Sequence, residues 1–302
     1  MSTVSLNSNN NANRPNGNGT PEATDSQPYQ APLPWGRWSL RAVALLYLAL
    51  VLIIPLIFLA QNGLAQGASA FWQAVRLPVA WSALLLTLWT AAVMAAINGV
   101  MGTLTAYVIV RYRFPGKALL NAVIDLPLSI PTLVTGVMLV ILFGPQTAIG
   151  AWLQQHLHIQ IIFAPPGIIL ALLFITFPFV VRAIQPVLEA MDREPEAAAA
   201  TLGAGPITIF RRITLPVIRL PLLSGMLLSF ARGIGEFGAI VLVSGNIPFH
   251  TQTAAVYVLG EVESQDQLGA SAMSLLMLAI AFGLVLLVDI LQQRSPRQEV
   301  AL

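Results

Sequence analysis

The sequence of 302 residues contains no cysteine and little charge. Without thiols, the chain can form no disulfide, bind no metal through cysteine and use no thiolate nucleophile. It has 15 Lys and Arg and 13 Asp and Glu, so that 9% of residues are charged and the formal net charge is +2. A soluble domain typically has about 25% charged residues. The composition therefore excludes an ordinary water-soluble enzyme, and this small net charge indicates no nucleic-acid partner.

Motifs for binding ATP or a catalytic metal are also missing. The single lysine, Lys117, does not belong to a Gly-x-x-x-x-Gly-Lys-Ser/Thr loop, so the chain has no phosphate cradle of that type. No His-Glu-x-x-His pair occurs, and all three histidines fall outside the apolar segments, where a membrane-embedded enzyme would need its base. We therefore expect a protein that is not an enzyme and that holds no metal and no cofactor.

Long apolar segments dominate the remaining sequence. Residues 1–36 are rich in Asn, Gly, Ser and Pro and predict a disordered tail. The rest of the chain, 37–302, carries six apolar segments, each of a length that crosses about 30 Å of hydrocarbon as a helix. These segments are 42–60, 81–110, 119–143, 166–186, 217–243 and 271–291. Because lipid offers no partner to an unpaired backbone amide, the predicted fold class is an all-α integral membrane protein with six transmembrane helices.

The positions of the basic residues predict the orientation in the membrane. Arg and Lys cluster before the first segment, between the second and third, between the fourth and fifth, and after the sixth, whereas the opposite side holds only Arg76. Cytoplasmic loops carry an excess of such residues. We therefore expect both termini, the tail and the long loop 187–216 to be cytoplasmic. Within the third segment, Pro127 and Pro131 predict a break or kink.

The loop 187–216 has the pattern of two short helices separated by a corner. Pro195 is tolerated in a first helical turn, and the four alanines that follow Glu196 favour a helix. Gly203 is suited to a left-handed cap, and Pro206 to the first position of the next helix. Such a thin surface is typical of a helix that enters a groove in another protein, with Phe210 as an apolar anchor. A plain surface loop is the alternative.

The same loop resembles a known family. The run Glu196-Ala-Ala-Ala, followed by Gly203 and, after nine further residues, by Ile213-Thr-Leu-Pro216, is similar to the signature of membrane subunits of ABC importers. Other segments, over about residues 80–292, resemble the sulfate/thiosulfate permeases of the CysT type, with the molybdate permeases as near relatives. These segments include Asp125-Leu-Pro127, Ala231-Arg-Gly-Ile-Gly-Glu-Phe-Gly238 and Ser244-Gly-Asn-Ile-Pro248.

The resemblance implies a type I importer permease in the bacterial cytoplasmic (inner) membrane, surrounded by lipid. Such a chain forms half of a path for sulfate or thiosulfate, with molybdate or tungstate as the alternative substrate. Its implied partners are a second permease subunit, which can be identical or different, a pair of ATP-binding subunits and an extracytoplasmic sulfate-binding protein. A stand-alone secondary anion transporter is the alternative from another class; it would need coupling acids within the membrane.

The resemblance also implies that the loop docks on the ATP-binding subunit. The residues expected to take part are Glu196, Ala197, Ala198, Ala199, Gly203, Phe210, Arg211, Ile213, Leu215 and Pro216. The family places its acid six residues before the glycine, where this chain has Ala197, whereas Glu196 is seven before it. One residue corresponds to a rotation of about 100° in a helix. We therefore expect docking to depend more on packing by the small and apolar residues than on this carboxylate.

Polar residues at membrane depth are the candidates for the path itself. Arg232 lies 13 residues beyond Arg219, which is roughly 20 Å along a helix, and Glu236 lies one turn further, where the two can pair. Arginine suits a tetrahedral oxyanion, and an intramembrane charge marks function by default. The candidate residues are Arg232, Gly235, Glu236, Gly238 and Asp125. The structural alternatives are an internal ion pair for Arg232 and a helix cap for Asp125, while Arg182 is expected to snorkel.

Overall fold

The computed structural model of the chain describes residues 34–293, so nearly all of the predicted Asn-rich tail lies outside the described residues. The chain divides into two compact units, residues 1–53 and 54–302. The described part of the first unit comprises α1 (Pro34–Leu48) and the short π-helix η1 (Ala49–Ile53). No strand occurs anywhere between residues 34 and 293, which agrees with the predicted all-α class.

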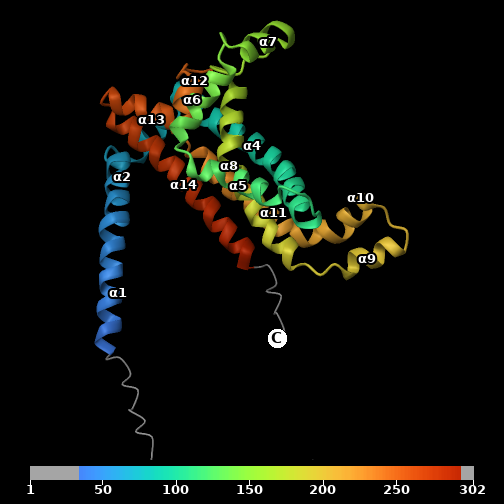
Figure 1. The fold of residues 1–302 in the computed structure, drawn as a ribbon. Coiled ribbons are helices and arrows are strands. Elements are labelled where there is room, and N and C mark those ends of the chain that lie inside the picture. Colours follow the sequence, from blue (N-terminus) through green and yellow to red (C-terminus); the bar gives the residue numbers. More distant parts are fainter. Residues whose placement is uncertain (1–33, 294–302) are drawn as a thin grey trace, which may run out of the picture. The chain divides into compact units, whose positions relative to one another are not determined.

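The second unit is a set of long helices with short helices at its two ends. Figure 1 shows α7 and the pair α9–α10 at opposite ends of this unit, with the long helices between them. In chain order its elements are α2 (Ile54–Leu64), α3 (Gly67–Val75), α4 (Pro78–Arg111), α5 (Lys117–Ser129), α6 (Thr132–Phe143), α7 (Ala148–Leu157), α8 (Pro165–Ala190), α9 (Glu194–Thr201), α10 (Pro206–Ile209), η2 (Phe210–Thr214), α11 (Leu215–Ile234), α12 (Gly238–Ser244), α13 (Ala254–Glu263) and α14 (Gln267–Gln293).

Membrane-spanning length is reached by five helical stretches in the described part of the chain. They are Ser39–Leu64, Pro78–Arg111, Pro165–Ala190, Pro206–Ile234 and Gln267–Ile290. The pair α5–α6 passes the same test when it is taken together, with a bend of 108° at its break, and so supplies a sixth candidate span. The all-α membrane bundle predicted from the apolar segments is therefore confirmed.

Two of the predicted segments are broken rather than continuous. The segment 119–143 breaks after Ser129, as its prolines predicted, because Pro131 excludes the helical conformation at Ile130, which is extended. The helix predicted over 217–243 is wrong in its length, since α11 ends at Ile234 and α12 starts only at Gly238. Glycine is a poor helix former, and the glycines at 233 and 235 weaken the helix at this point.

Small residues bring α4, α8 and α11 close together in the centre of the unit. A Cβ atom added to Gly102 on α4 would lie 2.8 Å from Cγ1 of Val180 on α8, and one added to Gly225 on α11 would lie 3.0 Å from Cα of the same residue. The first distance would force a neighbouring group to shift, and the second is tighter than almost all ordinary Cβ contacts. In the absence of a hydrophobic driving force between helices in lipid, such close backbone approach is the usual basis of helix association.

A buried polar link joins the same three helices. The Asn98 side chain of α4 is almost completely buried, and its Nδ2 atom donates to Oγ1 of Thr176 on α8 at 2.9 Å. Ser229 of α11 donates its hydroxyl to the backbone oxygen of Thr176 at 3.2 Å. Interhelical hydrogen bonds of this kind orient helices within a membrane bundle, and they set the position of the helix that carries Arg232.

Candidate functional site

Three ion pairs are found among the described residues: one lies at a helix break, one joins α5 to α8, and one lies at the loop 187–216. Two of them involve candidate path residues, and the third involves the acid of the loop. They are Arg232–Glu236, Arg182–Asp125 and Arg111–Glu196.

The Arg232–Glu236 pair lies at the break between α11 and α12. Nη1 of Arg232 is 2.7 Å from Oε2 of Glu236, so the pairing predicted from their spacing is confirmed. The Glu236 side chain is only 2% exposed, and its other oxygen accepts the backbone N–H of Ala239 at 3.2 Å, within the first turn of α12. One carboxylate therefore neutralises an arginine and also satisfies a backbone donor that the break leaves without a helical partner.

The Arg232 guanidinium has donors to spare. Its side chain is 37% exposed, and Glu236 is its only ion-pair or hydrogen-bond partner among the described residues. A guanidinium carries five N–H donors in a planar fork. Arg232 can therefore donate to an oxyanion without first leaving its acid. Its position in the last turn of α11 also favours a positive charge through the helix dipole.

The two candidate glycines of this break have different surroundings. Gly235 is exposed, and a Cβ added there would meet nothing within 4 Å. A Cβ on Gly238 would instead collide with the Thr132 hydroxyl, and one on Gly136 would lie 2.8 Å from the backbone oxygen of Ala239. Gly238 is therefore needed for the close contact between α6 and α12, which are the second halves of the two broken segments.

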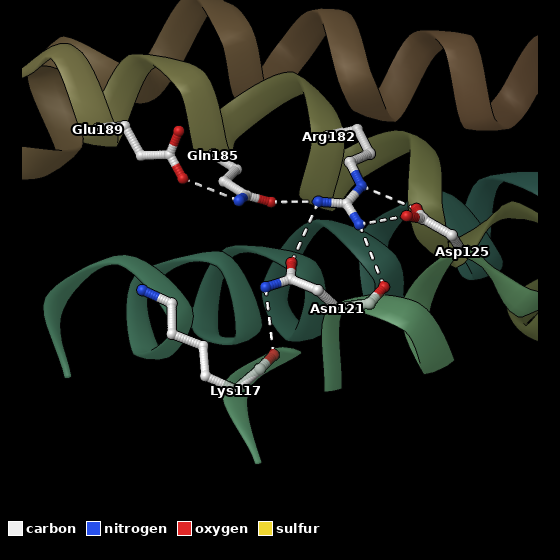
Figure 2. Close-up of polar contacts among 6 residues, drawn as sticks. All are labelled: Lys117, Asn121, Asp125, Arg182, Gln185 and Glu189. Atoms are coloured by element: carbon white, nitrogen blue, oxygen red, sulfur yellow. Dashed lines mark hydrogen bonds and ion pairs between the residues drawn. The ribbon is translucent and has the colours of Figure 1, made fainter. Parts of the chain in front are cut away.

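Asp125 lies inside α5 and pairs with Arg182 of α8, as Figure 2 shows. Its two carboxylate oxygens accept from Nε of Arg182 at 2.8 Å and from Nη2 at 2.5 Å. The helix-cap alternative for Asp125 is thus wrong, because α5 begins eight residues earlier, at Lys117. Arg182, which was expected to snorkel, is bound to this neighbouring helix.

Every N–H group of Arg182 has an acceptor. Besides its bonds to Asp125, Nη1 donates to Oδ1 of Asn121 at 3.2 Å and to Oε1 of Gln185 at 2.5 Å, and Nη2 donates to the backbone oxygen of Asn121 at 3.2 Å (Figure 2). Asn121 and Gln185 were not singled out by the sequence. Arg182 is therefore saturated and links two helices, whereas Arg232 keeps free donors.

An apolar groove of about 520 Å³ lies between α4, α5, α6 and α8. Its lining includes Phe143 and Phe174 and contains no charged side chain. An ion without partners is very costly to place in such surroundings. The groove therefore offers no site for an anion, and Arg232 is the better candidate for a residue that contacts one.

The loop 187–216 has the two-helix form that its sequence predicted. α9 carries Pro195 in its first turn, Gly203 has a left-handed φ of +82°, and Pro206 opens α10. The exposed apolar side chains are Leu202 and Ile207, at 88% and 75%, on either side of the corner. We refer to these two residues as the apolar corner.

The remaining loop candidates are divided between the surface and the interior. Phe210, expected as a docking anchor, is directed inward, because its ring packs edge-on against Tyr107 with 5.7 Å between centroids. Glu196 is also directed inward and pairs with Arg111 at 2.9 Å. Ala197, Ala198, Gly203, Arg211 and Pro216 are exposed, whereas Ala199, Ile213 and Leu215 are half-buried.

Comparison with known proteins places these residues within a described family. The family model for the inner membrane component of binding-protein-dependent transport systems matches residues 98–297. A relative from Nephroselmis olivacea, named "Probable sulfate transport system permease protein cysT", is 42% identical over 83% of this chain and 88% of its own. The sulfate transport system permease protein CysW of Synechocystis sp. is 42% identical over 86% of this chain and 94% of its own.

Solved structures show the same fold. A chain of a bacterial alginate ABC transporter, crystallised with an alginate pentasaccharide-bound periplasmic protein, superposes with a TM-score of 0.71. The match covers 86% of this chain and 94% of the other at 16% sequence identity. The arrangement of helices is therefore shared beyond the range of close sequence similarity.

The bidentate Asp125–Arg182 pair predicts a measurable coupling between α5 and α8. The side chains are 48% and 34% exposed, so we expect a coupling energy of about 1 kcal/mol rather than the larger value of a buried pair. A double-mutant cycle with Asp125→Asn and Arg182→Gln, measured by SDS unfolding of the purified chain, tests this. Glu189→Gln, which removes the charge of an exposed acid that accepts from Gln185 at 2.8 Å, should change stability by less than about 0.5 kcal/mol. Strictly additive losses for the two variants would contradict the expectation.

Proposed function

Because this chain belongs to the family of inner membrane components of binding-protein-dependent transport systems, we propose that it is the membrane subunit of an ATP-driven sulfate importer and forms half of its path. The observation that carries the proposal is the 42% identity to named sulfate transport system permeases over more than four fifths of the chain. Arg232 supplies a physical basis, since it is a partly exposed intramembrane cation with free donors beside a buried acid.

Import of sulfate needs an energy source that this chain does not contain. Moving one negative charge into an interior at −100 mV costs about 2.3 kcal/mol, so a dianion costs about twice that. The sequence has no phosphate-binding loop for ATP. The energy is therefore supplied by a separate ATP-binding subunit, whose closure shifts the bundle between outward-open and inward-open states.

The proposed assembly contains this chain, a second permease, two ATP-binding subunits and an extracytoplasmic sulfate-binding protein in a bacterial inner membrane. Relatives with both the cysT and the CysW names match at 42% identity, which supports pairing between two similar permeases. The family description itself refers to a binding protein. On the cytoplasmic side, the apolar corner is the surface that we assign to the ATP-binding subunit.

The test of the proposal is uptake of radiolabelled sulfate into proteoliposomes that hold the assembled complex and the external binding protein. We expect entry that requires internal ATP and that excess molybdate does not compete. Strong competition by a low concentration of molybdate would indicate that molybdate is the transported substrate. Entry without ATP and from this chain alone would overturn the importer proposal in favour of a secondary carrier.

Substitution of Arg232 should lower sulfate transport without dismantling the complex. Loss of one charge-assisted contact to the anion corresponds to about 1.5–3 kcal/mol, so Arg232→Gln should reduce uptake roughly 10- to 100-fold. Since this variant leaves Glu236 buried without its cation, the double variant Arg232→Gln with Glu236→Gln serves as a second measurement in which that penalty is absent. Arg219→Gln, at the exposed opposite end of α11, should transport normally. Wild-type uptake by both Arg232 variants would exclude Arg232 from the path.

An acid in the apolar corner should weaken binding of the ATP-binding subunit. Burial of a leucine contributes about 1.5–3 kcal/mol, so Leu202→Asp should lower the amount of co-purified subunit at least tenfold. The matched control is Val262→Asp on α13, where an apolar side chain is also largely exposed, at 59%. Equal retention of the subunit by both variants would show that the corner is not the docking surface.

A further inference from the structure

The acid of the cytoplasmic loop is bonded within its own chain. Oε1 of Glu196 accepts from Nη2 of Arg111 at 2.9 Å and from the Thr214 hydroxyl at 2.7 Å. The side chains of Arg111 and Glu196 are only 7% and 14% exposed. A carboxylate in this position has little surface left for a partner protein, and its interaction with a nearly buried arginine is weakly screened by solvent.

The partners of Glu196 belong to separate elements of the bundle. Arg111 is the last residue of α4, and its Nη1 donates to the backbone oxygen of Leu188, near the end of α8, at 3.3 Å. Thr214 is the last residue of η2, directly before α11. Next to this site, Nη2 of Arg193 donates to the backbone oxygen of Val110 at 3.1 Å, which attaches the start of the loop to α4 a second time. One carboxylate thus connects α9 directly to the end of α4 and to the residue before α11, and through Arg111 to the end of α8.

The position of Glu196 along α9 explains why its side chain points toward Arg111 rather than toward the surface. Ala197, one residue later, is exposed, and one residue rotates a helix by about 100°. A carboxylate at 197 would therefore be presented to a docked partner, whereas a carboxylate at 196 is presented to Arg111. The shift by one residue changes an outward-facing acid into an inward-facing one.

We propose that Glu196 is a positioning residue that makes the loop and the ends of α4, α8 and α11 move as one body, and that it does not contact the ATP-binding subunit. This inference rests on the proposed function. A partner that displaces the apolar corner would then displace α11, which carries Arg232 at its other end. The partner moves the apolar corner, and the hydrogen bonds of Glu196 transmit that movement to the helices.

The test measures sulfate transported per ATP hydrolysed by the reconstituted complex. Glu196→Gln and Arg111→Gln should each lower this ratio at least fivefold, while the complex still assembles and hydrolyses ATP. The ratio of the double variant should be no lower than that of either single variant. Glu194→Gln, which removes an exposed acid from the same helix, should leave the ratio unchanged. Additive losses for the two substitutions, or an equal loss in Glu194→Gln, would overturn the proposal.

A transplanted acid separates this role from a contact with the partner. In the double variant Glu196→Ala with Ala197→Glu, the acid faces outward, so we expect no recovery of the ratio relative to Glu196→Ala. Recovery would show that the acid acts on the ATP-binding subunit and would overturn the inference.

A measurement that does not depend on transport distinguishes this inference from the proposed function. Because the chain has no cysteine, a spin label at Ala200→Cys, an exposed site on α9, reports the mobility of the loop in the complex. We expect Glu196→Gln to raise this mobility above that in Glu194→Gln, and equal mobility would contradict the positioning role. Absence of ATP-driven sulfate uptake by the unsubstituted complex would instead refute the proposed function.

Discussion

The lack of water in the bilayer core is the constraint on which this structure depends. A backbone group or a charge that is left without a partner there costs several kcal/mol, so each interruption of a helix must be satisfied locally. At the break between α11 and α12, Glu236 meets this requirement by pairing with Arg232 and accepting the N–H of Ala239. In the other broken segment, Asp125 pairs with Arg182 from inside α5, four residues before that helix ends at Ser129.

The two arginines nevertheless differ in what they can do. All N–H donors of Arg182 are bonded to acceptors on α5 and on its own helix, α8, so the side chain joins these two helices and has no donor left for a ligand. Arg232 has a single carboxylate partner and keeps free donors, although the two side chains are similarly exposed, at 37% for Arg232 and 34% for Arg182. An anion path needs a cation that can exchange partners at low cost, because a dianion held by a saturated site would have to displace a bidentate carboxylate. The number of free donors, rather than the charge, therefore separates the two arginines.

The loop 187–216 directs its acid and its aromatic residue inward and its large aliphatic side chains outward. Glu196 is bonded to Arg111 and Phe210 packs against Tyr107, both of α4, whereas Leu202 and Ile207 are exposed. A surface of this kind fits an apolar groove in a partner and needs no charge at its centre. In the proposed assembly, contact with the partner and connection to the bundle would thereby fall to different residues of one short segment.

The sequence by itself determined the all-α membrane class, because the length and polarity of a segment decide whether it can be stable in lipid. It also determined the pairing of Arg232 with Glu236, since a spacing of four residues places two side chains within reach. Only the tertiary structure decided that α11 ends at Ile234 and that Arg182 binds Asp125, 57 residues away. Hydropathy is the same on both sides of such a break, and the partner of a charge depends on which helices lie side by side, which no local pattern encodes.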